Sequence, residues 1–146
     1  MSSTLPNFDE LLEEFSELTE WDERYEYIID LGKQLPALPE ELQIESNTVK
    51  GCMSTVWMVL GQDETASPEK KVRIQADSDS LIIKGLIVVL LSLFDGHTPK
   101  EIIEQDERQI FTDLGLDQNL SPQRRNGLFA MVQRIKQRAV ELASEQ

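Results

Sequence analysis

The stretch VKGCMSTVWMVL, Val49 to Leu60, decides the fold because the hydrophobic pattern of the chain changes there. Its second half, residues 55–60, is rich in β-branched and aromatic residues, which favour strands. Further on, Val72, Ile74 and Ala76 alternate with polar residues, as in a strand with one buried face. The two runs together predict a β-hairpin in the middle of the chain.

The polar stretch 61–71, which contains Ser67-Pro68, is the expected hairpin connection. A short strand around Thr48-Val49 is expected to precede the hairpin. This arrangement places Gly51-Cys52-Met53 in the turn between strands.

Helical periodicity holds on both sides of the hairpin. The N-terminal third predicts a helix that starts at a capping box of Asn7 and Glu10, and a second helix that ends near Gly32. The segment 35–39 contains two prolines and is expected to cross the surface in an extended form. After the hairpin, further helices are expected from Ser78 or Ser80 to Phe94, from Thr98-Pro99 onward, just before Gly115, and from Ser121-Pro122 to the C-terminus.

The last predicted helix has one apolar face. Its members are Leu128, Met131, Val132, Ile135, Ala139 and Leu142. Gly127 inside this helix costs about 1 kcal/mol relative to alanine, which indicates a close approach of another segment. The sequence therefore predicts an α+β fold, a small antiparallel sheet packed with helices. With no internal repeat or long linker, residues 1–146 are expected to form a single domain.

Composition and charge exclude several classes of function. The formal net charge of -13 and the isoelectric point near 4.4 repel phosphate backbones, so no nucleic-acid partner is expected. The longest apolar run, residues 86–91, is too short to cross a bilayer, so no membrane partner is expected either. The start of the chain shows no secretory signal, and the lone cysteine fits a reducing compartment.

The charge is unevenly distributed along the chain. Acidic residues dominate from Asp9 to Glu45, whereas five basic residues gather near the C-terminus: Arg124, Arg125, Arg134, Lys136 and Arg138. The pattern fits a solvated acidic face that maintains solubility, and it also fits an electrostatic surface for a protein partner.

Few residues could carry covalent or metal chemistry. His97 is the only histidine and lies at a predicted helix boundary, which favours a turn or capping role over a dyad with Cys52. No cysteine or histidine pair has zinc-ligand spacing. Cys52 could be a small buried hydrophobe, but a cysteine after Gly51 and before a strand can be presented to a partner. Lys50 lies close enough in sequence to favour its thiolate form.

The residues GCMSTVW, 51–57, resemble the signature around the acceptor cysteine of the SufE-like family. Collinear blocks that also resemble the family are WDERYEYII (21–29), LGKQLP (31–36), DSDS (77–80), IKGL (83–86) and LSPQR (120–124) with NGL (126–128). The resemblance extends from about Leu11 to Val140. Met53 and the length of the 61–71 connection depart from the family pattern at variable positions.

The resemblance implies a helper of a type II cysteine desulfurase, a pyridoxal-phosphate enzyme similar to SufS. Cys52 would attack the outer sulfur of the desulfurase persulfide and become a persulfide itself. The protein would stimulate the desulfurase and pass sulfur on to a downstream iron-sulfur scaffold. The desulfurase supplies the cofactor, so no cofactor or metal, and no independent catalytic turnover, is expected of this chain.

The family also implies a fold similar to that of iron-sulfur scaffolds, and a cytoplasmic or plastid-stroma-like location, with no transit peptide in this chain. Arg124 matches the arginine of the family's Ser-Pro-x-Arg and is expected near the acceptor loop, in partner binding or thiolate support. Lys84, Asp79 and Gly51 are further candidates for supporting or partner-binding roles.

Two other functions remain open at this point. An iron-sulfur scaffold needs about four thiolate-like ligands per cluster. The single cysteine and single histidine of this chain cannot supply that number within a monomer. An adaptor would stimulate the desulfurase without carrying sulfur, and it would therefore survive replacement of Cys52. The sequence indicates neither the particular desulfurase, nor the final sulfur recipient, nor the oligomeric state.

Overall fold

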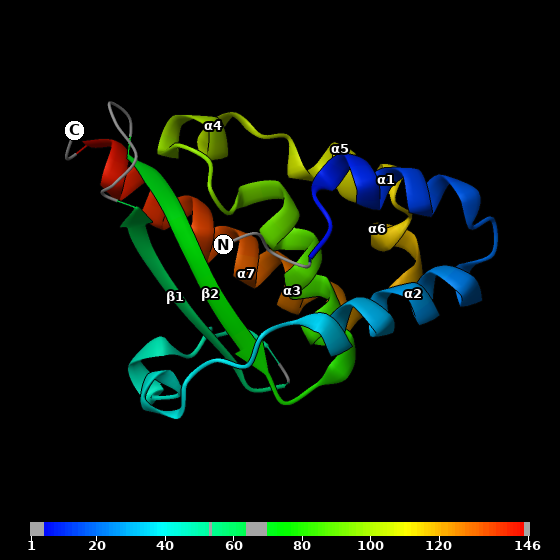
Figure 1. The fold of residues 1–146 in the computed structure, drawn as a ribbon, viewed down its shortest axis with the longest axis horizontal. Helices are drawn as coiled ribbons and strands as arrows, with labels where there is room; N and C mark the ends of the chain where they lie inside the picture. The colour runs from blue at the N-terminus through cyan, green and yellow to red at the C-terminus, as the bar shows by residue number, and fades with distance from the viewer. Residues whose placement is uncertain (1–4, 53, 64–69, 145–146) are drawn as a thin grey trace.

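The computed structural model describes residues 5–52, 54–63 and 70–144, in which an antiparallel hairpin lies along one side of a group of helices (Figure 1). The helices that precede the hairpin are α1 (Phe8–Glu17), α2 (Trp21–Gln34) and the short 3₁₀ helices η1 (Glu40–Leu42) and η2 (Glu45–Asn47). The hairpin consists of β1 (Val56–Asp63) and β2 (Lys71–Ser78). It is followed by α3 (Leu81–Phe94), α4 (Pro99–Glu104), α5 (Glu107–Asp113), α6 (Leu116–Asn119) and α7 (Pro122–Ser144). The predicted α+β fold is confirmed.

The hairpin has the predicted strands and a regular register. Val56 pairs with Ser78 and Gly61 with Arg73. The side chains of Val72, Ile74 and Ala76 are buried, so the alternation in the sequence identified the core face correctly. The predicted connection was too long, because residues 61–63 and Lys71 belong to the strands. Of the remaining residues, 64–70, the stretch 64–69 lies outside the described residues.

The expected strand before the hairpin is reduced to a single bridge. Thr48 pairs with Trp57 as an isolated antiparallel bridge, and the backbone N–H of Val49 donates to the carbonyl of Val56 at 2.9 Å. The pairing does not extend beyond this bridge, because η2 ends at Asn47 and a turn begins at Lys50. A turn therefore lies directly against the first residue of β1.

Helix α3 is the central element of the core. It contacts α2, β2, α1 and α7, and Figure 1 shows it between the hairpin and the two N-terminal helices. Its buried residues, from Ile82 to Phe94, cover most of the helix surface, whereas Leu81 is exposed and Lys84, Leu91 and Ser92 are partly exposed. Such a helix is stabilised by burial over a much wider surface than one amphipathic face. The apolar face predicted for α7 is buried as expected.

The helix starts follow local chemistry, as predicted. Asn7 and Glu10 form a capping box, Ser80 caps α3, and Thr98 caps α4 with Pro99 in its first turn. The short helix α6 was not predicted, since a helix of four residues offers no periodicity to detect. Among the described residues, no helix combines the length and the apolar character that a membrane span requires.

Helix α2 ends near Gly32, as predicted, but this glycine has a packing role instead of a C-cap role. Helix α2 continues to Gln34, and Gly32 lies inside it with no positive φ. A Cβ on Gly32 would lie 2.5 Å from the carbonyl oxygen of Leu81 and 2.8 Å from the backbone nitrogen of Gly85. A Cβ on Gly85 would in turn overlap the backbone carbonyl of Ile28. The two glycines thus allow α2 and α3 to cross in close contact instead of ending a helix.

Candidate functional site

Cys52 lies at the end of the turn that precedes β1. Gly51 has a φ of 95°, a conformation that glycine adopts without the steric cost of a Cβ. The far side of the turn is tied to the end of β2, because the backbone N–H of Thr55 donates to Asp79 Oδ1 at 3.2 Å. The Ser78 hydroxyl donates to the carbonyl of Thr55 at 2.8 Å. These bonds place Cys52 against the helices behind the hairpin.

The Cys52 side chain is half-buried in a cavity of about 170 Å³. The cavity is lined by Cys52, Ser54, Ser80, Ile83, Gln123, Arg124 and Gly127. The Sγ atom of Cys52 lies 3.6 Å from the carbonyl oxygen of Gly127, to which the thiol donates a hydrogen bond. The space exists partly because residue 127 has no side chain, since a Cβ there would lie 3.5 Å from Sγ. The close packing predicted at Gly127 is therefore a contact with Cys52.

Two helices begin at this cavity. Ser80 is the N-cap of α3, while Gln123 and Arg124 belong to the first turn of α7. The N-terminal ends of helices carry partial positive charge and favour nearby anions. Burial acts in the opposite direction, because it raises the pKa of the Cys52 thiol above its ordinary value. The free protein therefore favours the neutral thiol, close to groups that can stabilise an anion.

The expectation that Lys50 favours the Cys52 thiolate was wrong. The Lys50 Nζ lies 3.0 Å from Glu45 Oε1, and both side chains are largely exposed. A charge that is paired and solvated has little effect on a half-buried neighbour. The pKa of Cys52 is raised by burial instead.

Arg124 reaches the cavity, as the resemblance implied. Its Nη1 donates to the Tyr25 hydroxyl at 2.9 Å, and its Cζ lies 5.7 Å from the centroid of the Tyr25 ring. Sequence reasoning missed this partner, although Tyr25 lies within the block 21–29 that resembles the family. No spacing rule could have paired two residues that are 99 positions apart.

The other named candidates lie outside the lining of the cavity. Asp79 anchors the turn through Thr55, and Gly51 gives it its left-handed conformation. Lys84 does not belong to the lining of the cavity; its Nζ lies 3.7 Å from the buried carboxylate of Asp77. Asp77 Oδ2 also accepts from the backbone N–H of Leu38 at 3.1 Å, which fastens the extended segment to the end of β2.

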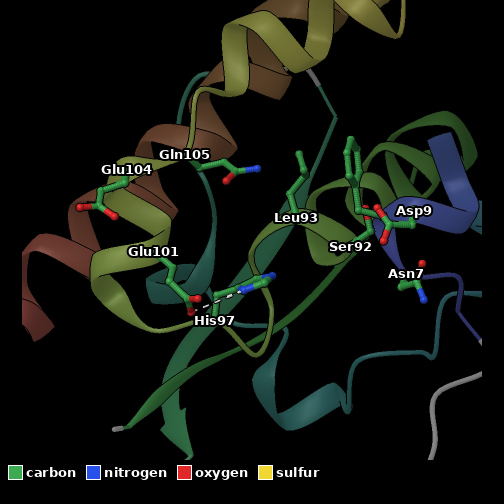
Figure 2. A pocket seen from close by; sticks show the side chains of 9 residues that line it. Asn7, Asp9, Ser92, Leu93, His97, Glu101, Glu104 and Gln105 are labelled. Carbon is green, nitrogen blue, oxygen red and sulfur yellow. Dashed lines mark ion pairs between the residues drawn. The ribbon is translucent and has the colours of Figure 1, made fainter.

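His97 lies at the opposite end of α3 from the start that lines the Cys52 cavity. A helix of the length of α3 spans roughly 21 Å, which excludes a contact between His97 and Cys52. His97 has the predicted turn role, since its carbonyl accepts from Val72 N–H at 2.8 Å. Figure 2 shows its ring beside Glu101, whose Oε1 lies 3.7 Å from His97 Nδ1, in a separate pocket of about 570 Å³.

The other basic residues of α7 have partners away from Cys52, either in other segments or, for Arg138, within α7 itself. Arg125 donates to the carbonyl of Asp117, and Arg134 donates to the carbonyl of Thr48. Lys136 pairs with Glu107 at 2.9 Å and Arg138 with Glu141 at 3.1 Å. Of the cluster predicted as a docking surface, Arg124 lines the Cys52 cavity and the other four residues do not. Within the described ranges, no three His, Cys, Asp or Glu side chains are grouped so that they could hold a metal ion.

The fold and the site define a class of α+β proteins that present a single thiol in the turn before the first strand of the hairpin, facing the starts of two helices. The family model described as "SufE: Fe-S metabolism associated domain" matches residues 9–139, and the chain belongs to this family. Its role is therefore in iron-sulfur metabolism.

The structure is also similar to the solution structure of a hypothetical protein from Thermus thermophilus. The TM-score is 0.71 and the sequence identity 20%, over 96% of this chain and 98% of that chain. At this identity the likeness supports the fold.

Proposed function

We propose that the protein is a sulfur acceptor that takes sulfane sulfur from the persulfide of a type II cysteine desulfurase onto Cys52. The observation that carries the proposal is the position of Cys52, the one cysteine of the chain, inside the family match and in a cavity at the protein surface. The protein would stimulate the desulfurase and pass the sulfur on to iron-sulfur cluster assembly. It would do so as a sulfur-transfer partner without catalytic turnover of its own, with the pyridoxal phosphate in the desulfurase.

The transfer is a thiol exchange at sulfur. The Cys52 thiolate attacks the outer sulfur of the desulfurase persulfide, a new S–S bond forms at Sγ, and the S–S bond of the donor breaks. The electron pair of the broken bond leaves with the desulfurase cysteine, which becomes a thiolate. The sulfur is transferred without net oxidation or reduction, and neither protein needs a further reactant.

The geometry supports both stages of this reaction. Before transfer, half-burial protects the thiol from oxidants, since susceptibility follows exposure and thiolate character. After transfer, the persulfide carries a more acidic outer sulfur, whose negative charge is favoured by the helix starts and by Arg124. The cavity offers about 170 Å³ next to Sγ for the additional atom.

Mass spectrometry of the intact protein after incubation with a cysteine desulfurase and cysteine tests the proposal. We expect an added sulfur that reductant removes and that maps to the peptide containing Cys52. Cys52→Ser should abolish both the added mass and most of the stimulation of the desulfurase. A Cys52→Ser protein that still stimulates the desulfurase fully would indicate an adaptor that carries no sulfur.

A further inference from the structure

Tyr25 holds the side chain of Arg124 from outside the Cys52 cavity. The Tyr25 hydroxyl accepts a hydrogen bond from Arg124 Nη1 at 2.9 Å, and the guanidinium also packs against the tyrosine ring. Tyr25 itself does not line the cavity. A hydrogen bond and a cation–π contact to the same ring together restrict a long side chain that is otherwise free to rotate.

The position of Tyr25 relative to the cavity is fixed by helix packing. Tyr25 belongs to α2, which crosses α3 in close contact at Gly32 and Gly85. The first turn of α3 supplies Ile83 to the cavity wall. The edge contact between Trp21 and Tyr25, with centroids 6.4 Å apart, adds support along α2. Tyr25 is therefore held in place by helix packing, and it binds the Arg124 guanidinium from that position.

The sulfur has a different partner in the same cavity. Cys52 Sγ donates to the carbonyl oxygen of Gly127, a contact that suits a protonated thiol and not a thiolate, which has no proton to donate. Among the described residues, no hydrogen bond joins Arg124 to Cys52, although both line one cavity of about 170 Å³. The cationic side chain that could stabilise the anion is thus directed to Tyr25 instead of the sulfur.

We propose that Tyr25 is a positioning residue that holds the Arg124 guanidinium away from Cys52 in the free protein, so that release from Tyr25 lets the guanidinium turn to the sulfur during transfer. The proposal rests on the proposed function, in which Cys52 is the sulfur acceptor. It assigns the Tyr25–Arg124 pair to the control of thiol reactivity. The guanidinium would then stabilise first the attacking thiolate and afterwards the persulfide anion.

The experiment measures the rate at which iodoacetamide alkylates Cys52 in the free full-length protein at pH 7. Tyr25→Phe keeps the ring and removes the hydroxyl that accepts from Arg124. We expect alkylation to become roughly three- to tenfold faster, the change that a thiol pKa lower by about half a unit to one unit would produce. Arg124→Gln alone should change the rate little, and the double variant should match Arg124→Gln, because the gain requires the released guanidinium.

Tyr27→Phe is the matched control. Tyr27 lies two positions further along α2, on a different side of the helix, with its ring edge-on to Phe15 of α1 at 5.6 Å. It should leave the alkylation rate unchanged. A Tyr25→Phe protein with an unchanged or slower rate overturns the proposal. An equal acceleration in the double variant also overturns it, since the gain would then come from looser packing of α2.

Alkylation requires no desulfurase, so this result is independent of the proposed function. Whether wild-type protein gains sulfur from a desulfurase and cysteine is scored separately by intact mass. Absence of that sulfur contradicts the acceptor role whatever the alkylation rates. If wild-type protein takes up sulfur normally but Tyr25→Phe leaves the alkylation rate unaltered, the positioning role is contradicted and the acceptor role is not.

Discussion

The backbone of Gly127 lies directly against the thiol of Cys52, with 3.6 Å between its carbonyl oxygen and Sγ. The contact joins the turn before β1 to α7 and covers one side of the reactive atom. Because residue 127 has no side chain, the remaining space next to Sγ stays open. The size of this residue therefore controls how accessible the sulfur is.

Gly127→Ala should stabilise the fold while it slows the chemistry. Alanine in a helix interior is favoured over glycine by about 1 kcal/mol, and the new Cβ would meet Sγ at an ordinary contact distance of 3.5 Å. The added methyl group would cover part of the sulfur. We expect a gain in unfolding free energy of up to about 1 kcal/mol by urea denaturation, together with slower alkylation of Cys52. A variant that is less stable than wild type would show that α7 cannot accommodate the methyl group.

The reactivity of Cys52 should depend on pH in a direction set by its burial. Burial raises the pKa of the thiol, so the alkylation rate of the native protein should reach its half-maximum at a higher pH than that of the protein unfolded in urea. The folded state binds this proton more tightly than the unfolded state. The resulting stabilisation is fully present below the thiol pKa of the unfolded chain and is lost as the pH rises through the pKa of the folded protein. Coincident alkylation curves would show that burial has no effect on this thiol.

Docking to the desulfurase should depend on Arg124 more than on Arg125. Reversing both charges with Arg124→Glu and Arg125→Glu is expected to weaken stimulation of the desulfurase, by about two- to fivefold for each exposed ion pair lost, and less at high salt. Arg124 lines the Cys52 cavity, whereas Arg125 donates to the carbonyl of Asp117. The single Arg124→Glu variant should therefore account for most of the loss.

Titration of desulfurase activity at two salt concentrations measures this effect, with circular dichroism to show that the fold is intact. If the double reversal changes neither the affinity nor its salt dependence, the two arginines lie outside the interface. The contact would then be sought around Asp77, Asp79 and Lys84.

Gly85→Ala should be strongly destabilising, in contrast to the substitution at Gly127. A Cβ at this position would overlap the carbonyl of Ile28 and lie 2.5 Å from its Cγ2, so α2 and α3 would have to separate. Overpacking of this kind costs about 1–3 kcal/mol, which urea denaturation would detect. Gly61→Ala on β1 is the control, since nothing lies within 4 Å of the Cβ it would add. Equal stability of Gly85→Ala and wild type would refute the close helix crossing.

Most of the secondary structure could be predicted from the sequence because its causes are local. The Asn7 and Thr98 capping boxes and the alternation at Val72, Ile74 and Ala76 depend on residues within a few positions of one another. The packing role of Gly32 was missed for the same reason. A glycine near the end of a helical pattern ordinarily marks a C-terminus, and its actual contacts belong to α3, about fifty positions away.

The sequence by itself determined the hairpin, the helices and a lone cysteine in a turn after Gly51, since each is specified by neighbouring residues. Only the tertiary structure decided what surrounds that cysteine. It turned Lys50 toward Glu45, brought the starts of α3 and α7 to one cavity, and joined Arg124 to Tyr25. Burial and charge at Sγ depend on side chains that the packing of distant helices brings together, and no pattern along the chain contains that information.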